Sequence, residues 1–206
     1  ENPYTPDAFH GKNVLITVIL LLILGFVFLL GFNEAVVVAI PLVALFLALN
    51  ATVVVVGILH IVAQPELIAG WTDALRVQGA GPGGLVGPAI IAFPLLVLGL
   101  SGFETGVSMM PLIKTSGATA EEQLRTRVRN TKLLLTTAAG ITSVYLIATS
   151  LITTLIIPAD GFAKGGPASG RALAYLAHDL LGEGFGSVYD LSSILILWFA
   201  GASAMA

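Results

Sequence analysis

The 206-residue sequence has no cysteine, few charged residues and only three histidines, and each shortage excludes a class of site. Without cysteine the chain can form neither a disulfide framework nor a thiolate metal site. His10, His60 and His178 lie far apart and lack the short spacing of metal ligands. Charged residues make up 10% of the chain and form no basic run, so we expect no nucleic-acid partner. We also expect no cofactor.

Hydrophobic residues are abundant instead, at 56% of the chain, which is too many for an ordinary soluble domain. Several apolar stretches reach or approach the roughly 20 residues with which a helix crosses a bilayer. The formal net charge of -3 is less informative, because in a membrane protein the position of each charge relative to the spans matters more. The sequence therefore predicts an all-α integral membrane protein with five transmembrane helices, in contact with the lipid bilayer.

The apolar stretches and the polar segments between them divide the chain into eight parts. In order, they are an external segment at 1–12, a transmembrane hairpin at 13–62, an external loop at 63–85, a broken transmembrane helix at 86–113, a cytoplasmic loop at 114–132, a transmembrane helix at 133–157, an external loop with an amphipathic helix at 158–189, and a truncated transmembrane helix at 190–206. The sequence lacks an initiating methionine and stops inside an apolar run, so we expect a fragment of a longer protein.

The basic residues predict the orientation of these spans. Of the nine lysines and arginines, five fall within 114–132: Lys114, Arg125, Arg127, Arg129 and Lys132. Short loops rich in lysine and arginine stay on the cytoplasmic side of a membrane. We therefore predict that the 114–132 loop is cytoplasmic and that the N-terminus of the chain is outside.

The stretch 93–111, FPLLVLGLSGFETGVSMMP, places the carboxylate of Glu104 inside an apolar span. A charge at membrane depth costs roughly 2.5 to 3.5 kcal/mol on insertion scales, so such a residue usually faces a cavity, a partner or a pathway. Pro94, Gly99 and Gly102 weaken a continuous helix around it. Two simpler interpretations remain open: Gly102 and Gly106 form a GxxxG packing face, or Glu104 is a structural carboxylate bonded to a neighbouring helix.

The segment GLSGFETGVSMMPLIK, with Gly102-Phe103-Glu104 at its centre, resembles the sixth transmembrane helix of the amino acid/polyamine/organocation (APC) superfamily of permeases. Similarly, WFAGASAMA at the end of the chain resembles the eighth helix of amino acid transporters in that superfamily. The resemblance makes the five spans equivalent to helices four to eight of a LeuT-like fold. That fold consists of two inverted five-helix repeats, so this chain holds parts of both and needs the remaining helices of the full-length transporter as partners.

The resemblance also implies a site. In this superfamily the sixth helix unwinds near the midplane, and the ends of its two halves direct partial charges at the substrate. The implied substrate-binding residues are Gly99, Leu100, Ser101, Gly102 and Phe103. Glu104 is the implied coupling residue, and Ser203 resembles a hydroxyl at the sodium site of sodium-coupled relatives. The lysine that serves proton coupling in some members is missing, because the second span contains none.

The expected function is secondary active transport of an amino acid or related organic cation across the cell membrane, by alternating access and proton symport, and not enzymatic catalysis. Potassium uptake by a permease of the same superfamily is the nearest alternative. An intramembrane serine protease is a distant one, since the GLSG at 99–102 matches a protease motif but the fourth and fifth spans contain no histidine base. The last alternative is a membrane scaffold that transports nothing.

Two isolated polar residues are expected to have structural roles. Asn50 lies within the second apolar stretch, where an amide side chain is typical of a hydrogen bond between helices. Asp190 precedes the last apolar stretch, where it is expected to cap the N-terminus of the final helix.

Overall fold

The computed structural model describes residues 12–30, 32–79, 84–98, 107 and 110–203, and every regular element within them is a helix. This agrees with the predicted all-α class. The chain divides into two compact units, one made of 1–65 with 149–206 and the other of 66–148.

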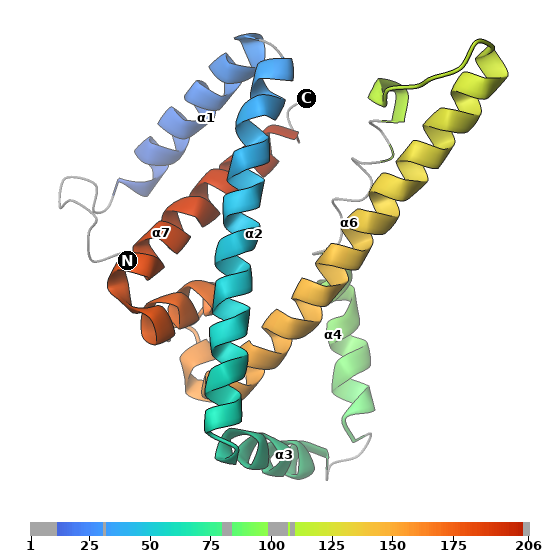
Figure 1. Cartoon of the computed structure of the whole chain (residues 1–206). Helices are drawn as coiled ribbons and strands as arrows, with labels where there is room; N and C mark the ends of the chain where they lie inside the picture. The colour runs from blue at the N-terminus through green and yellow to red at the C-terminus, as the bar shows by residue number, and fades with distance from the viewer. Residues whose placement is uncertain (1–11, 31, 80–83, 99–106, 108–109, 204–206) are drawn as a thin grey trace. The chain divides into compact units, whose positions relative to one another are not determined.

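The first unit is built around helices α1 (Asn13–Leu30), α2 (Phe32–Ala63) and α7 (Ala172–Ser203), and α7 packs against both of the others (Figure 1). A single residue separates α1 from α2, and the transmembrane hairpin expected at 13–62 stays a prediction. Trp198 of α7 also contacts α1, because its Nε1 donates a hydrogen bond of 2.6 Å to the carbonyl oxygen of Leu20.

Small and branched side chains form the core of this unit. Val53 of α2, Ile152 near the end of α6 (Ala120–Ile156) and Leu176 of α7 are fully buried. Gly57 lets α2 and the end of α6 approach closely, since a Cβ atom there would lie 3.1 Å from Cγ2 of Ile152.

The second unit contains α3 (Glu66–Gly79), α4 (Val86–Leu98), the 3₁₀ turn η2 (Met110–Leu112) and the first part of α6. The predicted loop at 63–85 thus holds a four-turn helix that we did not expect. The helix starts directly after Pro65, and an exposed ion pair of 3.3 Å between Arg76 and Asp73 lies within it. The residues of α3 other than its two glycines are compatible with a helix, although the stretch is too polar to be read as a span.

The predicted loop at 114–132 is also largely helical, because α6 starts at Ala120 and runs without interruption for 37 residues. Its start is a capping box: Thr119 Oγ1 accepts a hydrogen bond of 3.2 Å from the Glu122 amide, and Glu122 Oε2 accepts one of 3.3 Å from the Thr119 amide. The arginines that follow favour helix as well. Four of the five basic residues of this segment, all except Lys114, therefore lie on the first turns of a helix that continues into the apolar stretch.

The final transmembrane helix was expected to start at residue 190, but no helix starts there in the structure. The helix α7 runs from Ala172 to Ser203 and therefore joins the predicted amphipathic helix to the predicted final span. Its one non-helical residue is Gly182, with φ 83° and ψ 170°, conformations that glycine adopts readily. The predicted N-cap role of Asp190 is wrong, because helix continues on both sides of it.

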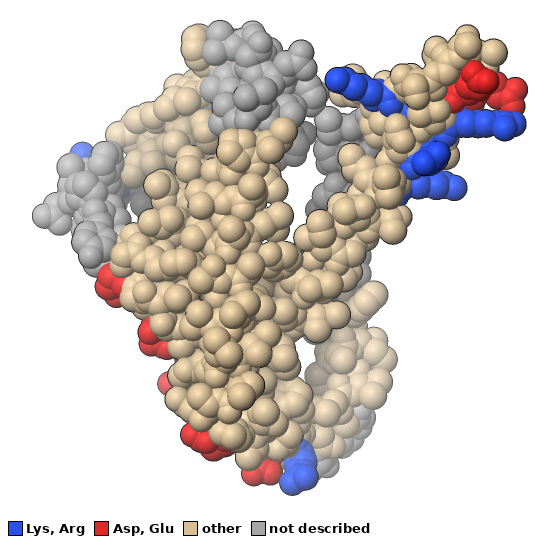
Figure 2. Space-filling model, in the orientation of Figure 1, with Lys and Arg blue, Asp and Glu red and all other residues tan. Residues whose placement is uncertain are grey.

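Among the described residues, three helices are long and apolar enough to cross a membrane: 39–63 of α2, 120–156 of α6 and 172–200 of α7. Their apolar side chains are widely exposed, as in Leu59, Ile147 and Leu197. Most of the surface visible in Figure 2 is accordingly uncharged, with basic side chains gathered at the N-terminal end of α6. In the predicted span at 86–113, the described helix α4 covers 13 residues.

Candidate functional site

The site predicted from the sequence lies outside the described residues, since these omit 99–106. The unwound turn at 99–102, the aromatic gate Phe103 and the coupling carboxylate Glu104 therefore stay predictions. Ser203 is the last residue of α7, and its contact with a coupling ion also stays a prediction. The described part of the chain holds a different polar cluster, in the middle of α7.

The break at Gly182 creates this cluster. It divides α7 into a first limb, 172–181, and a second limb, 183–203. Because the chain changes direction between the limbs, His178 of the first limb meets Asp190 of the second, although 12 residues separate them. In an uninterrupted helix, residues 12 apart would be about 18 Å apart along the axis.

The imidazole of His178 lies between two carboxylates. Its Nδ1 is 2.7 Å from Oε2 of Glu183, and its Nε2 is 3.0 Å from Oδ2 of Asp190. His178 and Asp190 are mostly buried, with 13% and 18% of their side chains exposed, whereas Glu183 is 57% exposed. We call these three residues the His178 cluster.

The two short contacts determine how many protons the His178 cluster holds. An ionised carboxylate only accepts hydrogen bonds, and a neutral imidazole donates from one nitrogen alone. Either an imidazolium donates to both carboxylates, or a neutral imidazole donates to one and accepts from the protonated form of the other. In both arrangements the cluster binds one proton more than a neutral imidazole between two carboxylates, and its net charge is -1.

A glycine of the second limb makes room for the ring. A Cβ atom added at Gly186 would overlap with Cγ, Nδ1 and Cδ2 of His178. The imidazole therefore lies directly against the backbone of the second limb, where only glycine fits. By contrast, a Cβ atom at Gly184 would meet nothing within 4 Å.

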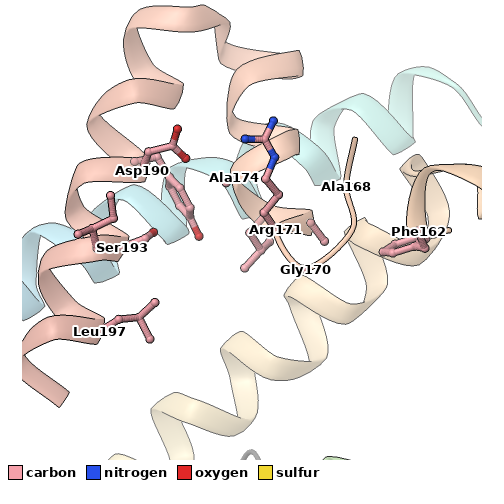
Figure 3. Close-up of a pocket in the computed structure, with 12 residues that line it drawn as sticks. Phe162, Ala168, Gly170, Arg171, Ala174, Asp190, Ser193 and Leu197 are labelled. Carbon is pink, nitrogen blue, oxygen red and sulfur yellow. The ribbon is translucent and has the colours of Figure 1, made fainter. Parts of the chain in front are cut away.

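One member of the cluster also lines a pocket. Asp190 is among the residues around an open pocket of about 760 Å³ between the two limbs of α7 and the preceding loop. Figure 3 shows Asp190, Ser193 and Leu197 along the second limb, with Arg171 across the pocket from them. The pocket thus combines a carboxylate, a guanidinium and a hydroxyl with an apolar wall.

A second polar contact fixes the position of the second limb against α2. Tyr189 Oη donates a hydrogen bond of 2.9 Å to Oδ1 of Asn50, whose Nδ2 donates to the Phe46 carbonyl oxygen at 2.8 Å. Asn50 and Tyr189 are both buried. The predicted interhelical hydrogen bond of Asn50 is therefore confirmed, and it holds the residue adjacent to Asp190.

The charge of the His178 cluster comes from α7 itself. Of the helices packed against α7, the described side chains of α1 include no titratable group, and those of α2 include only His60. No group of three histidine, aspartate or glutamate side chains in the described ranges is arranged to hold a metal ion. In the His178 cluster the carboxylates bind opposite edges of the ring, so they do not converge on one point.

Sequence reasoning missed the His178 cluster because it assigned its members to separate elements. His178 was expected in an external amphipathic helix and Asp190 at the start of a span. A signal was present in the stretch Gly182-Glu-Gly-Phe-Gly186, where three glycines in five residues favour a break and a close approach. Which side chains such a break brings together depends on its dihedral angles.

Comparisons with protein families, curated proteins and solved structures give no match to this chain.

Proposed function

We propose that the chain is part of a secondary active transporter that moves amino acids or related organic cations across the cell membrane, coupled to protons. The observation that carries this proposal is the His178 cluster, a proton-binding group that shares Asp190 with an open pocket. Ionisable residues within membrane-crossing helices are rare, and they are typical of proton relays and substrate pathways.

The geometry of the cluster supports coupling between a proton and the shape of α7. When the additional proton leaves, a neutral imidazole keeps one donor for two ionised carboxylates, so one of the two contacts must be lost. Both contacts join the two limbs across Gly182, the one to Asp190 over 12 residues and the one to Glu183 over five. Loss of the proton would therefore weaken the link between the limbs and shift the population of their arrangements.

The lining of the pocket supports the proposed substrate class. Asp190 suits an ammonium group, Arg171 suits a carboxylate, and Leu197 with its apolar neighbours suits a hydrocarbon side chain. A bare potassium ion, which has no hydrocarbon part, would gain little from the apolar wall. The pocket thus favours an organic ligand over the alternative of potassium uptake.

We also propose that the three membrane-length helices belong to the LeuT-like fold that the resemblance implies. In this arrangement the chain supplies five spans of an APC permease, and residues Gly99 to Phe103 line its substrate path. Glu104 and Ser203 then take part in coupling, the 114–132 segment is cytoplasmic, and the N-terminus of the chain is outside. The helices outside this chain complete the transport path.

The test is uptake into liposomes that contain the full-length protein. Labelled amino acids, organic amines and rubidium as a potassium substitute are screened with and without an inward proton gradient. We expect the gradient to drive uptake of an amino acid or amine, and His178→Gln to abolish the dependence on the gradient. Asp179→Asn, which alters an exposed carboxylate on the first limb, is the matched control and should transport normally.

Three outcomes would contradict the proposal. Uptake of rubidium alone would favour the potassium permease. Absence of flux for every solute, with the protein inserted and folded, would favour a scaffold. Gradient-driven uptake that is unchanged by His178→Gln would show that the coupling group lies elsewhere.

A further inference from the structure

The first turns of α6 present two different faces. On one face, side chains hold the preceding segment in place: Gln123 donates to the Gly117 carbonyl oxygen at 3.2 Å, Thr126 to that of Ser116 at 2.9 Å, and Asn130 to that of Lys114 at 3.3 Å. These three residues are spaced three and four apart and therefore share one side of the helix. That side is covered by residues 114–117.

The adjacent face is open and basic. Arg125, Arg129 and Lys132 are spaced four and three apart, so they also share a side of the helix, and all three are exposed. Together with Leu124 and Val128 they line a hollow of about 430 Å³. We call these five residues the basic face of α6.

The cations of the basic face are available to a ligand. Among the described residues, Arg129 and Lys132 have no ion-pair partner. Arg125 pairs with Glu121 at 2.7 Å, but both side chains are more than 70% exposed, so water competes for this contact. An anion can therefore approach all three without breaking a buried interaction.

The position of the basic face along α6 indicates which kind of anion it would bind. The helix is continuous, so Lys132 is followed directly by the exposed Leu133 and Leu134 and by an uncharged stretch up to Ile156. At a rise of about 1.5 Å per residue, that stretch is about 35 Å long, which matches the hydrocarbon thickness of a bilayer. The basic face then lies at the depth of the lipid headgroups, over about 10 Å of helix.

We propose that the basic face of α6 binds the phosphate of an anionic glycerophospholipid. The guanidinium groups of Arg125 and Arg129 and the ammonium of Lys132 donate hydrogen bonds to the phosphate oxygens. Leu124 and Val128 contact the glycerol and the upper acyl carbons. A zwitterionic lipid such as phosphatidylcholine carries a quaternary ammonium that the same cations repel, so the site prefers lipids with a net negative charge.

The experiment measures lipid preference on the purified full-length protein in detergent, with fluorescent phosphatidylglycerol as the probe and phosphatidylcholine as the competitor. We expect a preference for phosphatidylglycerol of at least about tenfold, which falls as salt is raised. The variant Arg125→Gln/Arg129→Gln/Lys132→Gln should lose the preference. Lys132→Gln alone should weaken binding about fivefold, as expected for one cation near an anionic surface.

The matched control removes three exposed cations elsewhere, in Lys12→Gln/Arg76→Gln/Lys164→Gln. It has the same net charge as the triple variant and should keep the preference. Equal loss in both would show a general charge effect and overturn the site, as would a preference that survives in the triple variant. Competition by millimolar inorganic phosphate would assign the face to a free anion instead. If the triple variant does not fold, Lys132→Gln without any weakening is the outcome that overturns the proposal.

Discussion

The helices α6 and α7 are both long enough to cross a membrane and both carry charged side chains, but they distribute those charges differently. In α6 every charged residue precedes Leu133, and the exposed Arg125–Glu121 pair is typical of them. In α7 the charges lie within the helix, where His178 and Asp190 are mostly buried and bonded to each other. A helix end reaches water and headgroups, so charges there cost little, whereas charges along a span need internal partners.

This difference accompanies a break in α7 and an uninterrupted α6. A continuous helix offers a side chain only neighbours three or four residues away. The break at Gly182 gives His178 a partner 12 residues along the chain, in addition to the nearer Glu183. In α6, by contrast, the charged residues need no distant partner, and no residue of the helix departs from helical geometry.

The substitution Gly186→Ala in α7 should have the largest effect on stability. The added methyl group overlaps with the imidazole of His178, so the His178 cluster must open or the second limb must shift. Overpacking of this kind typically costs about 1 to 3 kcal/mol, and we expect an equivalent fall in the free energy of unfolding measured in detergent. Gly184→Ala, where the methyl group has open space, is the control and should be neutral or stabilising. Equal stability of the two variants would show that the ring does not lie against Gly186.

The substitution Tyr189→Phe tests whether the second limb depends on its bond to α2. It leaves Oδ1 of Asn50 buried without this donor, at a cost of about 1 kcal/mol. The free energy of unfolding should fall by that amount. Tyr175→Phe, at a less buried tyrosine on the first limb, is the control and should change it little. If adding Asn50→Leu to Tyr189→Phe lowers stability by the full sum of the single effects, the two side chains are not coupled.

The substitution Glu121→Gln should have the smallest effect, because it changes an exposed side chain of α6. The ion pair with Arg125 is exposed, so its loss should change the free energy of unfolding by less than about 0.5 kcal/mol. Removal of the carboxylate also frees Arg125, so affinity for phosphatidylglycerol should rise slightly. A large loss of stability would mean that charges on α6 are as interdependent as those on α7.

Much of the architecture could be predicted from local sequence. Apolar stretches of sufficient length predicted helices in the regions of α1, α2, α6 and α7, and the amide of Asn50 in an apolar stretch predicted a bond between helices. The boundaries were less accurate. The capping box at Thr119 and Glu122 is a local signal that would have moved the start of α6 to its observed position.

The helical class and the apolar faces follow from local sequence alone, because hydropathy and helix propensity act between near neighbours in the chain. Which polar groups contact each other depends instead on the packing of the helices and on the break in α7. Asn50 and Tyr189 are 139 residues apart, and their contact depends on how α2 packs against α7. The His178 cluster depends on one backbone conformation at Gly182 and on the space left by Gly186. Glycine permits many conformations, so its presence signals a break without specifying the direction that the chain then takes.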